Sequence, residues 1–130
     1  MRSAVSTTLA AAFLVTTAAT AHAAPQTVQT FTGQGLDACP YGYLCLYENV
    51  NFNADAPGLI LKTNEDIRDL ATYGFDDKTS SVYNNTPWHW GFFYDKNYSK
   101  SMGGLDPIKT VNYNHRDEDN KMSSLISNSP

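Results

Sequence analysis

The sequence has few of the residues that build zinc and redox centres. It contains only two cysteines and three histidines among 130 residues. The spacing of Cys39 and Cys45 is longer than the Cys-x-x-Cys of thioredoxin-like redox motifs, and two cysteines without nearby histidines make a poor zinc site. We therefore favour a structural disulfide over both alternatives, which is typical of an oxidising, extracellular compartment.

The common catalytic signatures are also missing. The chain has no His-Glu-x-x-His and no Gly-x-Ser-x-Gly segment. His89 and His115 are expected at surface or strand positions, and Trp88 and Trp90 as rim and core aromatics. Paired acids are typical of glycosidases, but here they cluster with serines and do not flank a recognisable cleft. We expect a protein that is not an enzyme.

Positive charge is scarce. Lysine and arginine number 9 against 13 acidic residues, which gives a net charge of −4. This balance argues against nucleic acid and anionic membranes as partners, and it is compatible with binding cations. Apart from the N-terminus, no apolar run is long enough to span a bilayer.

The N-terminal segment resembles a secretory signal peptide. Arg2 is the only charge before Asp37, an Ala-rich apolar run follows it, and the run ends in "AHA" (21–23). We predict cleavage after Ala23, with Ala24 as the alternative, and a secreted protein. Removal of residues 1–23 leaves 107 residues with 8 basic and 13 acidic side chains, a net charge of −5.

The rest of the chain has no long helical pattern, and short strands alternate with turns. We expect a lead-in over 24–42, loose over 24–37, one or two helical turns over 64–72, and a turn over 101–105. The predicted strands cover 43–52, 58–62, 80–85, 90–98 and 123–127, with 109–114 as a strand or an irregular loop. In the first strand Tyr43, Cys45 and Tyr47 alternate with Leu44 and Leu46, so both faces are apolar. This pattern predicts an all-β sandwich.

Two similar octets organise the sequence. "DDKTSSVY" (76–83) and "DNKMSSLI" (119–126) have the same order of chemical types. Each follows an aromatic opening, "YENVNFNA" (47–54) or "FYDKNYSK" (93–100). The repeat predicts one domain over 43–130, with two Greek-key motifs at about 44–86 and 87–127 that are related by a pseudo-twofold axis.

The octets are rich in the hard oxygen ligands that calcium prefers. The candidate side chains are Asp76, Asp77, Ser80, Ser81, Asp119, Asn120, Ser123 and Ser124, and the carbonyls of Lys78 and Lys121 add further oxygens. Turn chemistry alone explains one such octet, but two at equivalent places favour a binding role. An EF-hand is excluded, because Met122 stands where the loop requires glycine.

The octets resemble the double-clamp calcium motif of microbial βγ-crystallins, Asn/Asp-Asn/Asp-x-x-Ser/Thr-Ser. The openings resemble the aromatic hairpins of that family, although Ala54 and Lys100 replace the usual glycine. The resemblance implies two calcium ions, each held by one octet and a hairpin carbonyl, from Glu48 or Tyr94. We expect one loop to use Asp77, Ser80 and the Lys78 carbonyl, and the other to use the equivalent Asn120, Ser123 and Lys121 carbonyl.

The segment "CPYGYLCLYENVNF" (39–52) is similar to the opening of secreted actinobacterial proteins grouped as peptidase inhibitor family I36. This resemblance implies an extracellular protease as a partner. The leading hypothesis is a secreted, monomeric, calcium-binding domain, and inhibition of a protease is a second hypothesis that is compatible with it. The alternative is a toxin or cell-wall-active protein on a crystallin fold.

Overall fold

The computed structural model describes residues 11–16 and 27–130, and the described chain is all-β, as predicted. Residues 11–16 form no helix or strand. The rest of the predicted signal peptide, over 1–23, lies outside the described residues. Within the described ranges, no helix is long and apolar enough to cross a membrane.

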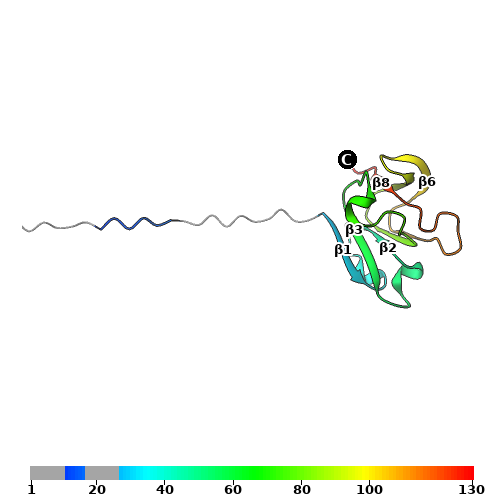
Figure 1. Ribbon diagram of the computed structural model, residues 1–130, viewed down its shortest axis with the longest axis horizontal. Helices are drawn as coiled ribbons and strands as arrows, with labels where there is room; N and C mark the ends of the chain where they lie inside the picture. The colour runs from blue at the N-terminus through cyan, green and yellow to red at the C-terminus, as the bar shows by residue number, and fades with distance from the viewer. Residues whose placement is uncertain (1–10, 17–26) are drawn as a thin grey trace, which may run out of the picture.

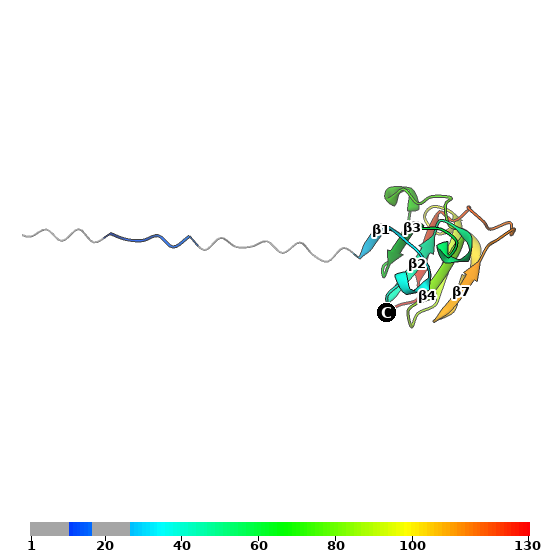
Figure 2. The ribbon, with the colours of Figure 1, turned by 90° about the horizontal axis from the view of Figure 1, so that it is seen from below.

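Two antiparallel sheets form the domain. The first has the spatial order β1-β3-β2-β4-β7, and Figure 2 shows these strands side by side. Its strands are β1 (Val28–Gly33), β2 (Tyr43–Tyr47), β3 (Gly58–Thr63), β4 (Ser81–Asn85) and β7 (Lys109–Asn112). The second has the order β6-β5-β8, and Figure 1 shows β6 and β8 above β1, β2 and β3. Its strands are β5 (Trp90–Asp95), β6 (Ser99–Leu105) and β8 (Ser124–Ser127).

The two sequence units exchange edge segments. β7 belongs to the second unit but pairs with β4 of the first, with Val82 opposite Val111. In the other direction, Ile67 of the first unit forms an antiparallel bridge with Leu125 in β8. The first sheet therefore takes a strand from the second unit, the second sheet takes a single bridge from the first unit, and the two units fold as a single body.

The alternation in β2 places a core on each side of the first sheet. Leu44 and Leu46 point into the main core between the sheets, with Trp90 and Phe92 of β5. Cys45 and Tyr47 point to the other side, into a smaller cluster with Ile60. Both faces of β2 are apolar because both are covered, as the sequence predicted.

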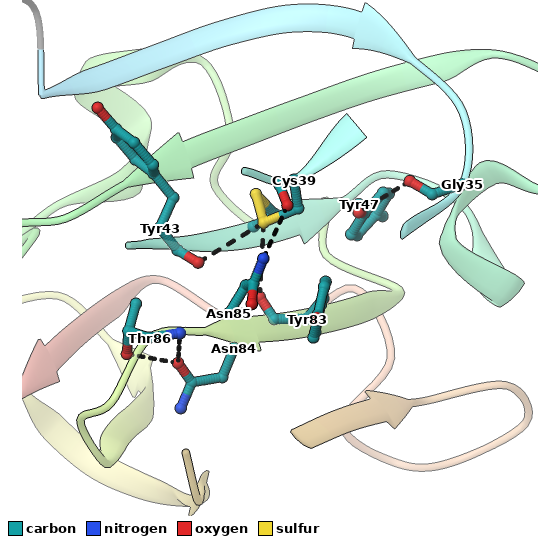
Figure 3. Close-up of a disulfide and its surroundings, with 9 residues drawn as sticks. Gly35, Cys39, Tyr43, Tyr47, Tyr83, Asn84, Asn85 and Thr86 are labelled. Atoms are coloured by element: carbon teal, nitrogen blue, oxygen red, sulfur yellow. Dashed lines mark hydrogen bonds between the residues drawn. A yellow bond between two sulfur atoms is a disulfide. The ribbon is translucent and has the colours of Figure 1, made fainter. Parts of the chain in front are cut away.

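The expected loose lead-in over 24–37 is wrong, because residues 28–33 form the edge strand β1 along the whole of β3. The segment alternates β-branched residues with others, which favours a strand although it is largely polar. Beyond β1, the amide of Gly35 donates to Phe52 O at 2.8 Å, and the Tyr47 hydroxyl donates to Gly35 O at 3.1 Å (Figure 3). The segment that follows β1 is therefore hydrogen-bonded to the first aromatic opening, residues 47–54.

Two other local predictions differ from the structure. The helical turns expected over 64–72 reduce to a short 3₁₀ helix, η3 (Leu70–Tyr73), which is capped by the Asp69 side chain. Because Ile67 forms a β-bridge with Leu125 in β8, the residues around it do not form a helix. The turn expected over 101–105 lies within β6, where Gly103 and Gly104 continue the strand. The other 3₁₀ helices are η1 (Leu36–Ala38) and η2 (Val50–Asn53).

Cys39 and Cys45 form the predicted disulfide. The bond lies beside β2, which carries Cys45, and close to the end of β4, where the Asn85 side chain donates to Cys39 O at 3.0 Å (Figure 3). Both cysteines are buried. The bond therefore fixes residues 39–45 against the first sheet.

Replacing both Cys39 and Cys45 with Ala should lower the free energy of unfolding by about 2 kcal/mol, because the short loop loses its closure constraint. Urea unfolding of the variant, compared with the oxidised wild-type protein, measures this difference. An unchanged midpoint would contradict the assignment, and each single variant serves as a control for loss of the buried side chain.

Candidate functional site

The two octets lie side by side and contact each other reciprocally. The amide of Asp77 donates to Met122 O at 3.1 Å. At the equivalent positions of the other octet, the amide of Asn120 donates to Thr79 O at 3.0 Å. Asp77 is equivalent to Asn120 in the repeat, and Met122 is equivalent to Thr79, so each hydrogen bond is the counterpart of the other. The two octets are therefore related by a local pseudo-twofold axis.

Each octet is also tied to the opening of its own unit. The amide of Ser80 donates to Tyr47 O at 2.8 Å, and the amide of Ser123 donates to Phe93 O at 2.9 Å. Asp77 and Asn120 have positive φ angles of 53° and 56°. Aspartate and asparagine tolerate this left-handed conformation better than most residues, which explains their place in the tight loop.

The second serine of each octet holds a hairpin together. Ser81 Oγ donates to Asn49 O at 2.7 Å and accepts from Phe52 N at 3.0 Å. The equivalent Ser124 Oγ donates to Asp95 O at 2.6 Å and accepts from Tyr98 N at 3.0 Å. Both serines are fully buried. Their hydroxyls were candidate calcium ligands in the sequence analysis, but in the structure they form hydrogen bonds within the hairpins.

The first serine of each octet faces the opposite octet. Ser80 Oγ donates to Asn120 Oδ1 at 3.1 Å. Across the axis, Asp77, Ser123 and Tyr94 line one cavity. The structure therefore brings Ser80 together with Asn120, and Ser123 together with Asp77, whereas the sequence analysis had grouped these residues within each octet.

The cavity at Asp77 is acidic. Its other lining residues are Asp69, Asp76, Asp95, Lys96, Asn97 and Ser99. Burial raises the pKa of Asp77, the carboxylates of Asp76 and Asp95 raise it further, and Lys121 lowers it. Negative charge is thus concentrated on one side of the octet pair without full compensation by cations.

The first acid of each octet has a buried oxygen without a partner. Oδ1 of Asp76 and Oδ1 of Asp119 are both buried and accept no hydrogen bond. Buried carboxylate oxygens are normally paired, because an unpaired one loses its hydration. Their equivalent positions in the repeat show that the feature belongs to the octet and not to one loop.

The octets bring together oxygen atoms of the kinds that hard cations accept as ligands. The described residues hold no cluster of three or more His, Cys, Asp or Glu side chains that could bind a metal. A cation here would depend on hydroxyl, amide, carboxylate and backbone oxygens together, which is the mixed set that calcium accepts. The Glu48 carboxylate accepts from Leu59 N at 2.9 Å through Oε2, and the family resemblance assigns the ligand at this position to the backbone carbonyl.

The remaining candidates of the sequence analysis have other roles. His89 Nδ1 lies 3.0 Å from Asp106 Oδ1 at the surface, and His115 is exposed. Trp90 is buried, with its indole N–H donating to Thr86 Oγ1 at 3.0 Å, and Trp88 is partly exposed. The two tryptophans are the expected core and rim aromatics.

Replacing Ser81 or Ser124 with Ala should destabilise the protein by about 1–3 kcal/mol, because each change leaves a buried amide and a carbonyl without their partner. Ser80→Ala is the matched control, since its hydroxyl makes only the contact to Asn120. Chemical denaturation without added metal provides the measurement. Equal stability of all three variants would refute the hairpin role.

The solved structures similar to this chain are βγ-crystallin domains. A domain described under "Evolution of the eye lens beta-gamma-crystallin domain fold" has a TM-score of 0.65 and 23% identity, covering 78% of this chain and 99% of its own. A βγ-crystallin from Ciona intestinalis has a TM-score of 0.53 and 28% identity, covering 65% and 96%. Spherulin 3a from Physarum polycephalum has a TM-score of 0.53 and 24% identity, covering 68% and 84%. The predicted crystallin-like fold is confirmed.

No curated protein sequence matches the chain significantly. The profile described as "Peptidase inhibitor family I36" matches residues 33–105, more than half of the chain. The match includes the disulfide loop, the first octet and strands β2 to β6. The chain therefore belongs to peptidase inhibitor family I36 and has a βγ-crystallin fold.

Proposed function

We propose that this chain is a secreted, non-enzymatic, calcium-binding domain whose two sites are each shared between the octets. The reciprocal pairing of the octets is the observation that supports this function best. Asp77, Ser123 and the carbonyls of Lys78 and Tyr94 would form one site, called here the Asp77 site. Asn120, Ser80 and the carbonyls of Lys121 and Glu48 would form the other, the Asn120 site.

Calcium would supply positive charge where the chain now holds unpaired oxygens. Asp76 and Asp119 place buried carboxylate oxygens behind the two loops. Burial and the nearby acids Asp76 and Asp95 also disfavour the ionised form of Asp77. Saturation at 100 times the dissociation constant adds about 2.7 kcal/mol per site if only the folded state binds, and raises the Tm on the order of ten degrees.

Calorimetric titration with calcium chloride should therefore give two ions per chain, and millimolar calcium should raise the Tm. The Asp77 site should bind more tightly, because its loop contributes a carboxylate where the Asn120 site has an amide. Magnesium is a suitable control, because it requires a more regular coordination and releases its water reluctantly. No heat of binding together with an unchanged Tm would refute calcium binding.

The sharing of ligands has its own test. If Ser80 and Asn120 serve the same ion, Ser80→Ala combined with Asn120→Ala should still bind one calcium ion. Ser80→Ala combined with Asp77→Ala should impair both sites. Stoichiometry by calorimetry distinguishes the pairs, and the reverse result would restore the grouping within each octet.

Inhibition of an extracellular peptidase is the second candidate function. It is supported by membership of family I36, whose profile covers the disulfide-closed loop. The buried disulfide is also typical of secreted chains, which would meet such peptidases outside the cell. Calcium binding and inhibition do not exclude each other.

A panel of one metallopeptidase, one serine, one cysteine and one aspartic peptidase tests this second function. The wild-type protein should inhibit at least one of them at micromolar concentration or below, and the product of prolonged incubation should show whether the chain is cleaved. Full activity of every peptidase of the panel at a large excess of the protein would contradict this function.

A further inference from the structure

The end of the sandwich opposite to the octets has a different surface. β4 begins at the first octet and ends at Asn85, which lies opposite Tyr43 at the start of β2. On its other side, Asn84 lies opposite Lys109 at the start of β7. The segments before β2, after β4 and before β7 therefore leave the sheet together, at the end that is far from the octets.

Each of these three segments exposes one large hydrophobic side chain. Tyr41 is 70% exposed, Trp88 38% and Ile108 50%. We call these three residues the rim. Within 27–130 the other exposed large hydrophobics are only Leu36 and Tyr73. Three of the five exposed large hydrophobic side chains within 27–130 thus lie at one end of a single sheet.

The backbone under the rim is rigid. Each rim residue directly follows a proline, Pro40, Pro87 or Pro107, and a proline ring fixes its own φ angle. The disulfide also closes the loop that carries Tyr41. Side chains presented from a fixed backbone lose little conformational entropy when they bind.

Two adjacent asparagines at the end of β4 hold all three segments. The buried Asn84 side chain donates to the carbonyls of Trp88, Leu105 and Asp106 at 2.8, 3.1 and 2.9 Å. On the other side of the strand, the Asn85 side chain donates to Cys39 O (Figure 3). One strand end therefore fixes the relative positions of the three anchors.

Ile108 is held in an unfavourable conformation. Its φ angle is 55°, in the left-handed region that β-branched residues avoid. Half of its surface is exposed, so burial in the domain does not explain why isoleucine stands there. Strained backbone conformations cluster at active sites, ligand clamps and switch regions.

We propose that the rim is the surface that contacts the inhibited peptidase, an inference that rests on the second function proposed above. Tyr and Trp are the residues most enriched among interface hot spots, and the centre of an interface is poor in charge. At this end His89 and Asp106 already pair with each other. Tyr41 and Trp88 lie inside the region that matches the inhibitor family, and Ile108 lies just beyond it.

The test measures inhibition constants against the peptidase of the panel that the wild-type protein inhibits most strongly. Tyr41→Ala and Trp88→Ala should each weaken inhibition on the order of 30-fold, as truncated hot spots do. Ile108→Gly should weaken inhibition without lowering the Tm, because it removes the side chain and the backbone strain together.

Leu36→Ala and Tyr73→Ala are matched controls, since they remove exposed large hydrophobic side chains outside the rim, and both should inhibit like the wild-type protein. An active wild-type protein with unaffected rim variants would overturn the rim assignment alone. A wild-type protein that inhibits no peptidase would overturn the inhibitor function and this assignment with it. Sedimentation of the free protein is a further check: concentration-dependent dimers lost in Trp88→Ala would make the rim a self-association surface and overturn the proposal.

Discussion

The reciprocal contact between the two octets is the constraint on which the rest of the structure depends. Two backbone hydrogen bonds, from Asp77 to Met122 and from Asn120 to Thr79, fix the loops against each other. The loops lead directly into β4 and β8, so this contact also sets how the two sheets stack. The exchange of β7 and Ile67 between the sheets follows the same symmetry. Separating the units would therefore break both sheets and both candidate sites at once.

The sequence predicted the repeat well, because the octets and the aromatic openings use local chemistry that is visible in the order of residue types. The alternation of side chains in β2 and the disulfide could also be predicted from the sequence. β1 was missed because its apolar content is low, and its stability comes from pairing with β3. The residue that each serine contacts could not be predicted from the sequence, because spacing along the chain does not tell whether Ser80 faces Asp77 or Asn120. Only the packing of one octet on the other decides it.

The two ends of the sandwich differ in chemistry. The octet end is polar and rich in unpaired oxygens, whereas the opposite end carries apolar side chains on a stiff backbone. The pairs Pro-Tyr, Pro-Trp and Pro-Ile are visible in the sequence, but they lie far apart along the chain, and only the register of β2, β4 and β7 gathers them. The two proposed activities, ion binding and peptidase recognition, would therefore use separate surfaces of this small domain. Each can then change without disturbing the other.

The buried Asn84 side chain has a practical consequence for making the protein. Asn84, Asn85 and Thr86 form an Asn-x-Thr sequence, the acceptor that eukaryotic secretory pathways glycosylate. In the folded protein this amide is fully buried, and it holds three carbonyls while its oxygen accepts from Thr86. A sugar attached there before folding would have no space and would remove those hydrogen bonds. Bacterial secretion is for this reason the production route that suits this fold.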